Sequence, residues 1–316
     1  MPYLGGIPVV DVEPTGPVLN GFEDSRTLAF RSIDGADLIS FTGDEFIVRR
    51  QATGLDLAPR DVVEVTYAGE DGGQLDDITV GSRVWGLPLR VGAMSGHRAF
   101  LDNRAALRRL LNHRRVDYRA HGGTFDLVAS SVIGERSLRS AYVSGWEGAD
   151  EQATSGSYFE TLPLVCKSVR PYWTGPRWST PKIQKPPAAP WFGTFPPVFT
   201  PSRTLGQDIG VTVEGDASGY CRVEVAGYAP SVLVTGPGLR VSIPQGVAAG
   251  ESCVVETYPP QAGVYFNGLV DWSRVAPSRQ FAAIDPGEAV FNVDLGNSSP
   301  DAYAVISGPT LWDAPW

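Results

Sequence analysis

The sequence predicts a mainly β protein with one helix, built as an N-terminal β-barrel or sandwich domain followed by a C-terminal β-sandwich. Short runs of β-branched and aromatic residues recur along the chain, separated by turns rich in glycine and proline. One stretch of the first half has helical periodicity, and none does after residue 206. A proline-rich stretch from Arg170 to Pro201 separates the two halves.

The first half contains seven runs with the composition of β-strands. Turn sequences such as Asp34-Gly35 and Gly69–Gly73 lie between them. Apolar and polar residues alternate from Val84 to Val91, which predicts a strand with one buried face. The seven runs are residues 38–41, 45–48, 62–67, 82–91, 124–129, 138–143 and 157–166.

The helix is expected near residues 103–113, with Asp102 or Asn103 as its N-cap. An apolar stripe with i, i+3, i+4 spacing should face the sheet of the first domain. This stripe is formed by Leu107, Leu110 and Leu111.

Six arginines lie in and just after this helix, at positions 104, 108, 109, 114, 115 and 119. They form either a solvated outer face or a contact with the acidic turns of a neighbouring copy. The candidate subunit contacts are Arg104, Arg108 and Arg115 against Asp71, Asp76 and Asp77. Asp76-Asp77 is also interpreted as a solvated surface turn, with an acid–base or cation-binding role as the alternative.

The proline-rich stretch predicts a stiff, ordered connector, because proline fixes φ and removes a backbone donor. Its aromatic residues argue against a loose tether, since disordered linkers are polar. Tyr172, Trp173 and Trp178 are expected to anchor it. We therefore divide the chain into domain 1–175, connector 176–205 and domain 206–316.

The second half contains eight strand-like runs at short intervals, which is typical of an antiparallel sandwich or jelly roll. They are residues 209–215, 220–226, 231–235, 239–243, 252–257, 263–267, 289–295 and 302–307.

The composition and motifs point away from enzymes and nucleic-acid binders. The net charge is −9, and neither half is basic. The sequence has no run of about 18 apolar residues, so no membrane helix is expected. Because the N-terminus lacks the features of a signal peptide, synthesis in the cytoplasm is expected. Three scattered cysteines, with Cys221 and Cys253 in apolar runs, predict buried free thiols. No catalytic residue, cofactor site or metal site is expected.

The order of these features resembles the distal tail proteins of long-tailed, non-contractile bacteriophages (siphoviruses), particularly those of actinobacterial hosts. The glycine-rich turn Gly69–Gly73 precedes the strand from Arg83 to Val91, and the leucine-rich helix follows. Pro171-Tyr172-Trp173 matches the end of the family's first domain. Val223–Gly227 and Asp285-Pro286-Gly287 resemble parts of its second domain, with departures at Ile284-Asp285 and at Glu288.

The resemblance implies a structural virion protein at the phage tail tip, with a galectin-like C-terminal sandwich. It implies a homo-hexameric ring that joins the tail tube protein to the tail-tip hub protein and carries receptor-binding proteins. The tape-measure protein would be a further partner, and DNA would only pass through the lumen. No membrane insertion and no enzymatic activity are implied.

Two other classes of function remain open. A carbohydrate-binding adhesion module is one, because eight tryptophans can supply sugar-stacking platforms. A glycan-cleaving enzyme is the other, and it requires two carboxylates at a set separation in a cleft.

Overall fold

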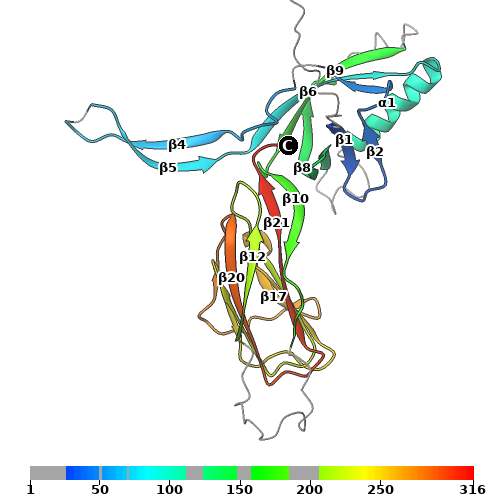
Figure 1. The fold of residues 1–316 in the computed structure, drawn as a ribbon. Helices are drawn as coiled ribbons and strands as arrows, with labels where there is room; N and C mark the ends of the chain where they lie inside the picture. The colour runs from blue at the N-terminus through cyan, green and yellow to red at the C-terminus, as the bar shows by residue number, and fades with distance from the viewer. Residues whose placement is uncertain (1–25, 50–51, 70, 112–123, 148–157, 185–205) are drawn as a thin grey trace, which may run out of the picture.

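The computed structural model describes residues 26–49, 52–69, 71–111, 124–147, 158–184 and 206–316 (Figure 1). The described part is mainly β, with one α-helix, and its sheets stack without closing into a barrel. The mainly β class and the sandwich architecture are confirmed. All paired strands in the three sheets run antiparallel, as expected for sheets joined by short turns.

The described residues of the N-terminal part form nine strands besides the β10 and β11 strands described below. They are β1 (Thr27–Ser32), β2 (Leu38–Ser40), β3 (Phe46–Val48), β4 (Arg60–Val65), β5 (Gln74–Val80), β6 (Arg83–Gly92), β7 (Phe125–Ser131), β8 (Gly134–Ser144) and β9 (Phe159–Ser168). Each of the seven strand-like runs of the first half overlaps one of these strands. Strands β1 and β5 were not predicted from the sequence.

Strand β6 shows the expected alternation. The side chains of Trp85, Leu87, Leu89 and Val91 are buried, and Val84 on the other face is exposed. Strand β6 pairs with β3 on one edge and with β9 on the other, which places it inside its sheet. Arg83 continues the buried face, although it carries a charge.

Helix α1 runs from His97 to Leu111, so it begins six residues earlier than expected. Asp102 is therefore an internal residue and not the N-cap. The first turn closes where the amide of Phe100 donates to the carbonyl of Gly96. The buried side chains of Phe100, Leu107, Leu110 and Leu111 confirm the apolar stripe and extend it by a turn.

The C-terminal part is a two-layer sandwich. One layer has the order β12-β20-β14-β15-β19, and the other is β18-β17-β16-β13-β21. Their bounds are β12 (Gly206–Val213), β13 (Arg222–Ala226), β14 (Ser231–Gly236), β15 (Leu239–Ile243), β16 (Ser252–Glu256), β17 (Gly263–Phe266), β18 (Leu269–Val270), β19 (Gln280–Phe281), β20 (Gly287–Gly296) and β21 (Tyr303–Trp312). All eight expected runs lie in strands. A short 3-10 turn, η1 (Pro259–Gln261), follows β16.

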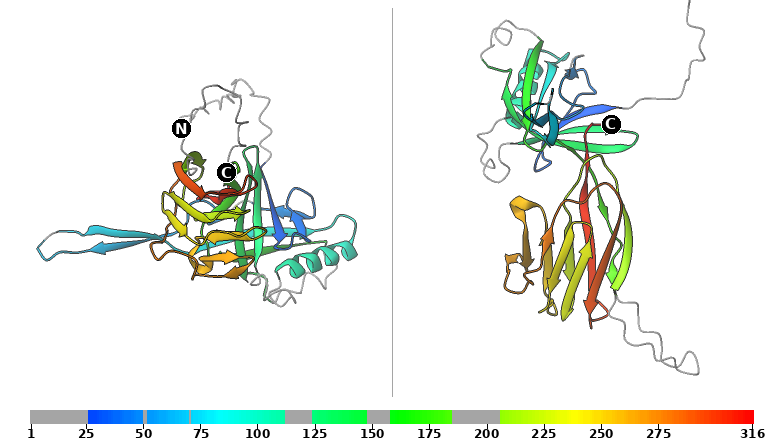
Figure 2. Two further views of the ribbon diagram at one scale, coloured as in Figure 1. Left: turned by 90° about the horizontal axis from the view of Figure 1, so that it is seen from below. Right: turned by 90° about the vertical axis from the view of Figure 1, so that its left-hand side faces the viewer.

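Strands β10 (Trp173–Ser179) and β21 run side by side between the two parts (Figures 1 and 2). No strand was predicted here, because the density of prolines argues against one. The pairing tolerates Pro176 because the register shifts between Thr174 and Arg177, and such a bulge leaves the proline out of the hydrogen-bond ladder. A short strand, β11 (Ile183–Gln184), also pairs with β21. The rest of the connector, residues 185–205, lies outside the described residues.

The buried apolar residues form two clusters that meet at β10. Trp173 belongs to the N-terminal cluster, whereas Trp178 and Ile183 belong to the C-terminal one. Successive parts of β10 therefore contribute to different cores.

Candidate assembly surfaces

Strands β4 and β5 form a hairpin that projects from the body of the molecule (Figure 1). We call residues 60–80 of this hairpin the arm. Asp76 and Asp77, expected in a turn, lie in β5 instead, because the strand continues past them to Val80. Asp71 lies in the loop at the tip. All three aspartates are exposed, which leaves them open to a contact with another molecule.

The arm combines exposed apolar side chains with acidic ones. Val62 is 61% exposed and Leu75 is 61% exposed, and Val63 and Ile78 are also largely open to solvent. An isolated two-stranded ribbon is at most marginally stable in water, and clustered exposed apolar side chains mark interaction surfaces. The described acidic residues of the arm are Asp61, Glu64, Asp71, Asp76 and Asp77, against the single base Arg60. The arm is therefore suited to a partner surface that is both apolar and basic.

The exposed face of helix α1 is basic. Arg98, Arg108 and Arg109 are exposed, while the apolar stripe faces the body. Arg108 also lies over the ring of Trp146, 5.5 Å from its centroid. Arg115 lies outside the described residues. The described part of α1 thus offers a positive patch, which we call the helix face.

Arg104 does not belong to the helix face, contrary to the expectation for this residue. It is 6% exposed, and its Nε lies 2.7 Å from Oε2 of Glu160 on β9. The reason is its position in the helix: Arg104 falls four residues after Phe100 and three before Leu107, on the buried stripe. The ion pair with Glu160 compensates its charge. We therefore leave Arg104 out of the proposed contact.

The arm and α1 project from opposite sides of the N-terminal part, a placement visible in two perpendicular views (Figures 1 and 2). A chain with complementary surfaces on opposite flanks can bind the next copy head to tail. Such heterologous contacts give rings when the rotation closes.

The junction between the two parts is held by a second buried arginine, Arg83, which is 1% exposed. It donates to the carbonyl oxygens of Leu55 at 2.6 Å, Pro171 at 2.8 Å and Asp313 at 2.7 Å. It also donates to the carbonyl oxygen of Asp56. Burial lowers the pKa of its guanidinium, while the charges of Asp313 and Asp56 oppose that shift. One side chain thus ties three distant segments together.

The three expected anchors of the connector differ in their surroundings. Trp173 is fully buried, and its indole Nε1 donates to the carbonyl oxygen of Leu55 at 3.0 Å. Trp178 is buried in the C-terminal core, stacked on Phe291 at 6.0 Å between ring centroids. Tyr172 is half-buried, and burial raises the pKa of its hydroxyl.

The described residues hold neither a cluster of metal-binding side chains nor a membrane-spanning helix. They contain no group of three or more His, Cys, Asp or Glu side chains placed to hold a metal ion. No helix among them has the length and apolar character needed to cross a membrane. The cysteines Cys166, Cys221 and Cys253 are free and buried, as expected.

Comparisons with known proteins find similarity in structure rather than in sequence. No protein-family model matches the chain, and no curated protein matches it. A crystal structure of the Dit protein of phage SPP1, described as a paradigm of the hub adsorption apparatus in phages infecting Gram-positive hosts, matches with a TM-score of 0.59 and 14% identity. The match covers 90% of this chain and 98% of that one. The chain therefore has a Dit-like fold along almost its whole length.

Two further matches are structures of the phage P2 baseplate in its activated conformation. The one with calcium has a TM-score of 0.48 and 9% identity, and covers 92% of this chain and 99% of that one. The one with strontium has a TM-score of 0.44 and 10% identity, and covers 89% and 97%.

Proposed function

We propose that this chain is the distal tail protein of a siphovirus, a structural component of the tail tip that forms a hexameric ring. The observation that carries the proposal is the likeness to SPP1 Dit, which spans both parts of the chain and nearly all of that protein. A likeness confined to the C-terminal sandwich would have had little weight, because sandwiches of that kind serve many functions.

The two assembly surfaces support a ring as the form of assembly. The arm of one copy, with its acidic and apolar side chains, would bind the basic helix face of the next. Charge pairs at the rim add little affinity each, so Val62, Leu75 and their apolar neighbours would supply most of it. In this arrangement the N-terminal domain, residues 1–175, forms the ring around the tube axis.

The C-terminal domain, residues 206–316, would project outward as a galectin-like sandwich. The ring would join the tail tube protein to the tail-tip hub protein, next to the tape-measure protein, and provide a platform for receptor-binding proteins. DNA would pass through the lumen, and the net charge of −9 suits passage rather than retention of phosphates. In this role the chain needs no catalytic residues.

Electron microscopy of the tail tip of virions that carry this chain tests the proposal. We expect a sixfold ring around the tube axis into which the described fold can be placed, with each arm over the α1 of its neighbour. A tail tip in which this chain forms no such ring would refute the proposed function. A ring with other contacts between copies would refute only the arm–helix assignment.

A further inference from the structure

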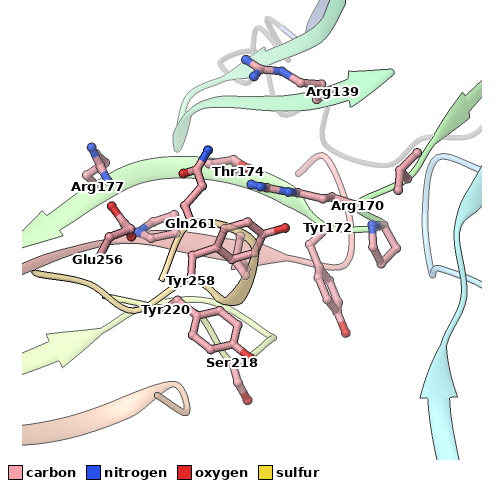
Figure 3. A pocket seen from close by; sticks show the side chains of 14 residues that line it. Arg139, Arg170, Tyr172, Thr174, Arg177, Ser218, Tyr220, Glu256, Tyr258 and Gln261 are labelled. Atoms are coloured by element: carbon pink, nitrogen blue, oxygen red, sulfur yellow. The ribbon is translucent and has the colours of Figure 1, made fainter. Parts of the chain in front are cut away.

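A hollow of about 710 Å³ lies at the junction of the two parts, beside β10 and β21 (Figure 3). Neither the fold likeness nor the proposed ring assigns it a role. Residues from five regions of the chain line it: β8, the segment that leads into β10 with β10 itself, the turn before β13, the end of β16 with η1, and β21. Its polar and aromatic lining includes Arg139, Arg170, Tyr172, Thr174, Arg177, Ser218, Tyr220, Glu256, Tyr258 and Gln261.

The aromatic part of the lining is preorganised. The rings of Tyr220 and Tyr258 pack edge to face, with centroids 5.7 Å apart and planes at 72°. The guanidinium of Arg170 lies 4.1 Å from the centroid of the Tyr258 ring. Both tyrosines are half-buried, so part of each ring remains open to a ligand. Aromatic rings held in this way bind flat apolar faces, including the C–H faces of sugar rings.

The charged part of the lining favours an anion. Arg170 and Arg177 are exposed and, within the described residues, neither forms an ion pair with a carboxylate. Arg139 faces them across the hollow (Figure 3) and is paired with Asp126 at 3.0 Å. Glu256 is the one carboxylate in the described lining. Two arginines that form no ion pair with a described carboxylate therefore line the hollow, in a chain whose net charge is −9.

We propose that this hollow binds an acidic saccharide, a sugar that carries a carboxylate or a phosphate. Arg170 and Arg177 would bind the anionic group, since guanidinium forks match carboxylates and phosphates. The exposed parts of Tyr220 and Tyr258 would contact a sugar face. Glu256 and Gln261 would bind hydroxyl groups, because a saccharide site needs a few placed acceptors and donors beside its apolar surface.

The single carboxylate also distinguishes binding from cleavage. Glycoside hydrolysis ordinarily uses two carboxylates that flank the bond, and the described lining has only Glu256. The site is therefore assigned to binding. It adds host-surface or glycan recognition to the proposed structural role and does not depend on the ring.

Titration calorimetry of the full chain with four probes tests the assignment. The probes are trigalacturonate, glucose 6-phosphate, the neutral sugar galactotriose and inorganic phosphate. We expect at least one acidic sugar to bind at least about tenfold more tightly than both galactotriose and inorganic phosphate, which corresponds to about 1.4 kcal/mol. Which acidic sugar binds identifies the anionic group.

Two variants and a control locate the binding. Arg177→Gln and Tyr258→Ala should each weaken binding of the acidic sugar by about tenfold or more. Arg240→Gln, at an exposed position of β15 outside the lining, should leave it unchanged. Arg177 is exposed, so its variant should fold even if the Tyr258 variant is destabilised.

Three results would overturn the proposal. The first is that neither acidic sugar binds at concentrations up to about 10 mM. The second is that inorganic phosphate binds as tightly as either sugar, which would show a simple anion site. The third is that Arg177→Gln binds the acidic sugar as tightly as the unchanged chain, which would place any binding elsewhere.

Discussion

At the scale of single residues, two arginines that look like surface residues in the sequence are buried. Arg83 donates hydrogen bonds to backbone carbonyls, and Arg104 forms an ion pair with Glu160. Both lie on the inward face of their element, Arg83 on β6 and Arg104 on α1. A buried charge persists only where it is paired and hydrogen-bonded. Each of these residues should therefore be important for stability.

Replacing Arg83 with Met should destabilise the chain by about 3 kcal/mol or more, because buried carbonyls in three segments lose a charged donor. Chemical unfolding in urea measures the change. Arg31→Gln is the matched control, since Arg31 pairs with Glu135 at a partly exposed site and should cost less than about 1 kcal/mol. Equal effects of the two variants would show that Arg83 does not hold the junction together.

Arg104→Met should cost about 3–5 kcal/mol, because it removes the cation that lies beside the buried carboxylate of Glu160. The double variant Arg104→Met, Glu160→Leu should recover part of that loss, since the buried carboxylate is then removed together with the cation. A double-mutant cycle measured by thermal unfolding tests this. Additive losses in the double variant would contradict a coupled buried pair.

Burial raises the pKa of the Cys221 thiol from its ordinary 9.0 to about 11, and that of Cys253 to about 12. Between about pH 9 and pH 11 the unfolded chain therefore loses thiol protons that the folded chain keeps. The free energy of unfolding should fall as the pH rises through that range, and this contribution should be fully present below pH 9. Unfolding curves at pH 8 and pH 10.5 measure the fall. The fall in the free energy of unfolding should be smaller in the Cys221→Ala variant. An equal fall would show that the Cys221 thiol does not contribute to it.

At the scale of elements, α1 and the arm differ in how much of their surface is buried within the chain. Helix α1 buries an apolar stripe against the body, where it contacts β6 and β1. The arm buries almost none of its surface within the chain, since all but the last residue of each of its strands is exposed. The helix is therefore stabilised by its own domain, whereas the arm is expected to gain stability from a partner.

Leu110→Asp should unfold the N-terminal part, because it would bury an unpaired charge at a site that is 7% exposed. Leu101→Asp in the same helix is the control, because Leu101 is 38% exposed and its variant should stay folded. Circular dichroism and thermal unfolding compare the two variants. A normally folded Leu110→Asp protein would show that the stripe does not support the domain.

At the scale of the whole molecule, the placement of the arm and α1 on opposite flanks sets the expected assembly. Changing Asp71, Asp76 and Asp77 together to Lys should prevent ring formation, because like charges would then face the arginines of the next copy. All three residues are exposed, so the fold of the isolated chain should be unchanged. Negative-stain microscopy of tail tips assembled with the variant measures ring formation.

A control and a rescue make this charge-reversal test specific. Changing the exposed acids Asp44, Glu214 and Asp301 to Lys alters the net charge equally but away from the arm, and rings should still form. Adding Arg108→Glu and Arg109→Glu to the arm variant should restore part of the assembly. Intact rings in the arm variant would exclude the arm–helix contact.

From the sequence alone we could predict the mainly β class, most strands of the C-terminal sandwich and the apolar stripe of α1. Each of these depends on a local period, of two residues in strands and 3.6 in the helix, which a single chain segment displays. The same local rules missed β10, because the bulge that accommodates Pro176 depends on its pairing with β21, more than 120 residues away.

Long-range contacts in the folded chain determine which charged residues are buried and which surfaces lie together. Arg104 is buried because it lies on the apolar stripe of α1 and because Glu160 of β9 lies opposite it. The hollow combines Arg139, Arg170 and Tyr258, which are distant in the sequence and adjacent only because β8, β10 and β21 pair. Pairing between distant segments leaves little trace in local composition, so the placement of the arm, the junction and the hollow required the folded chain.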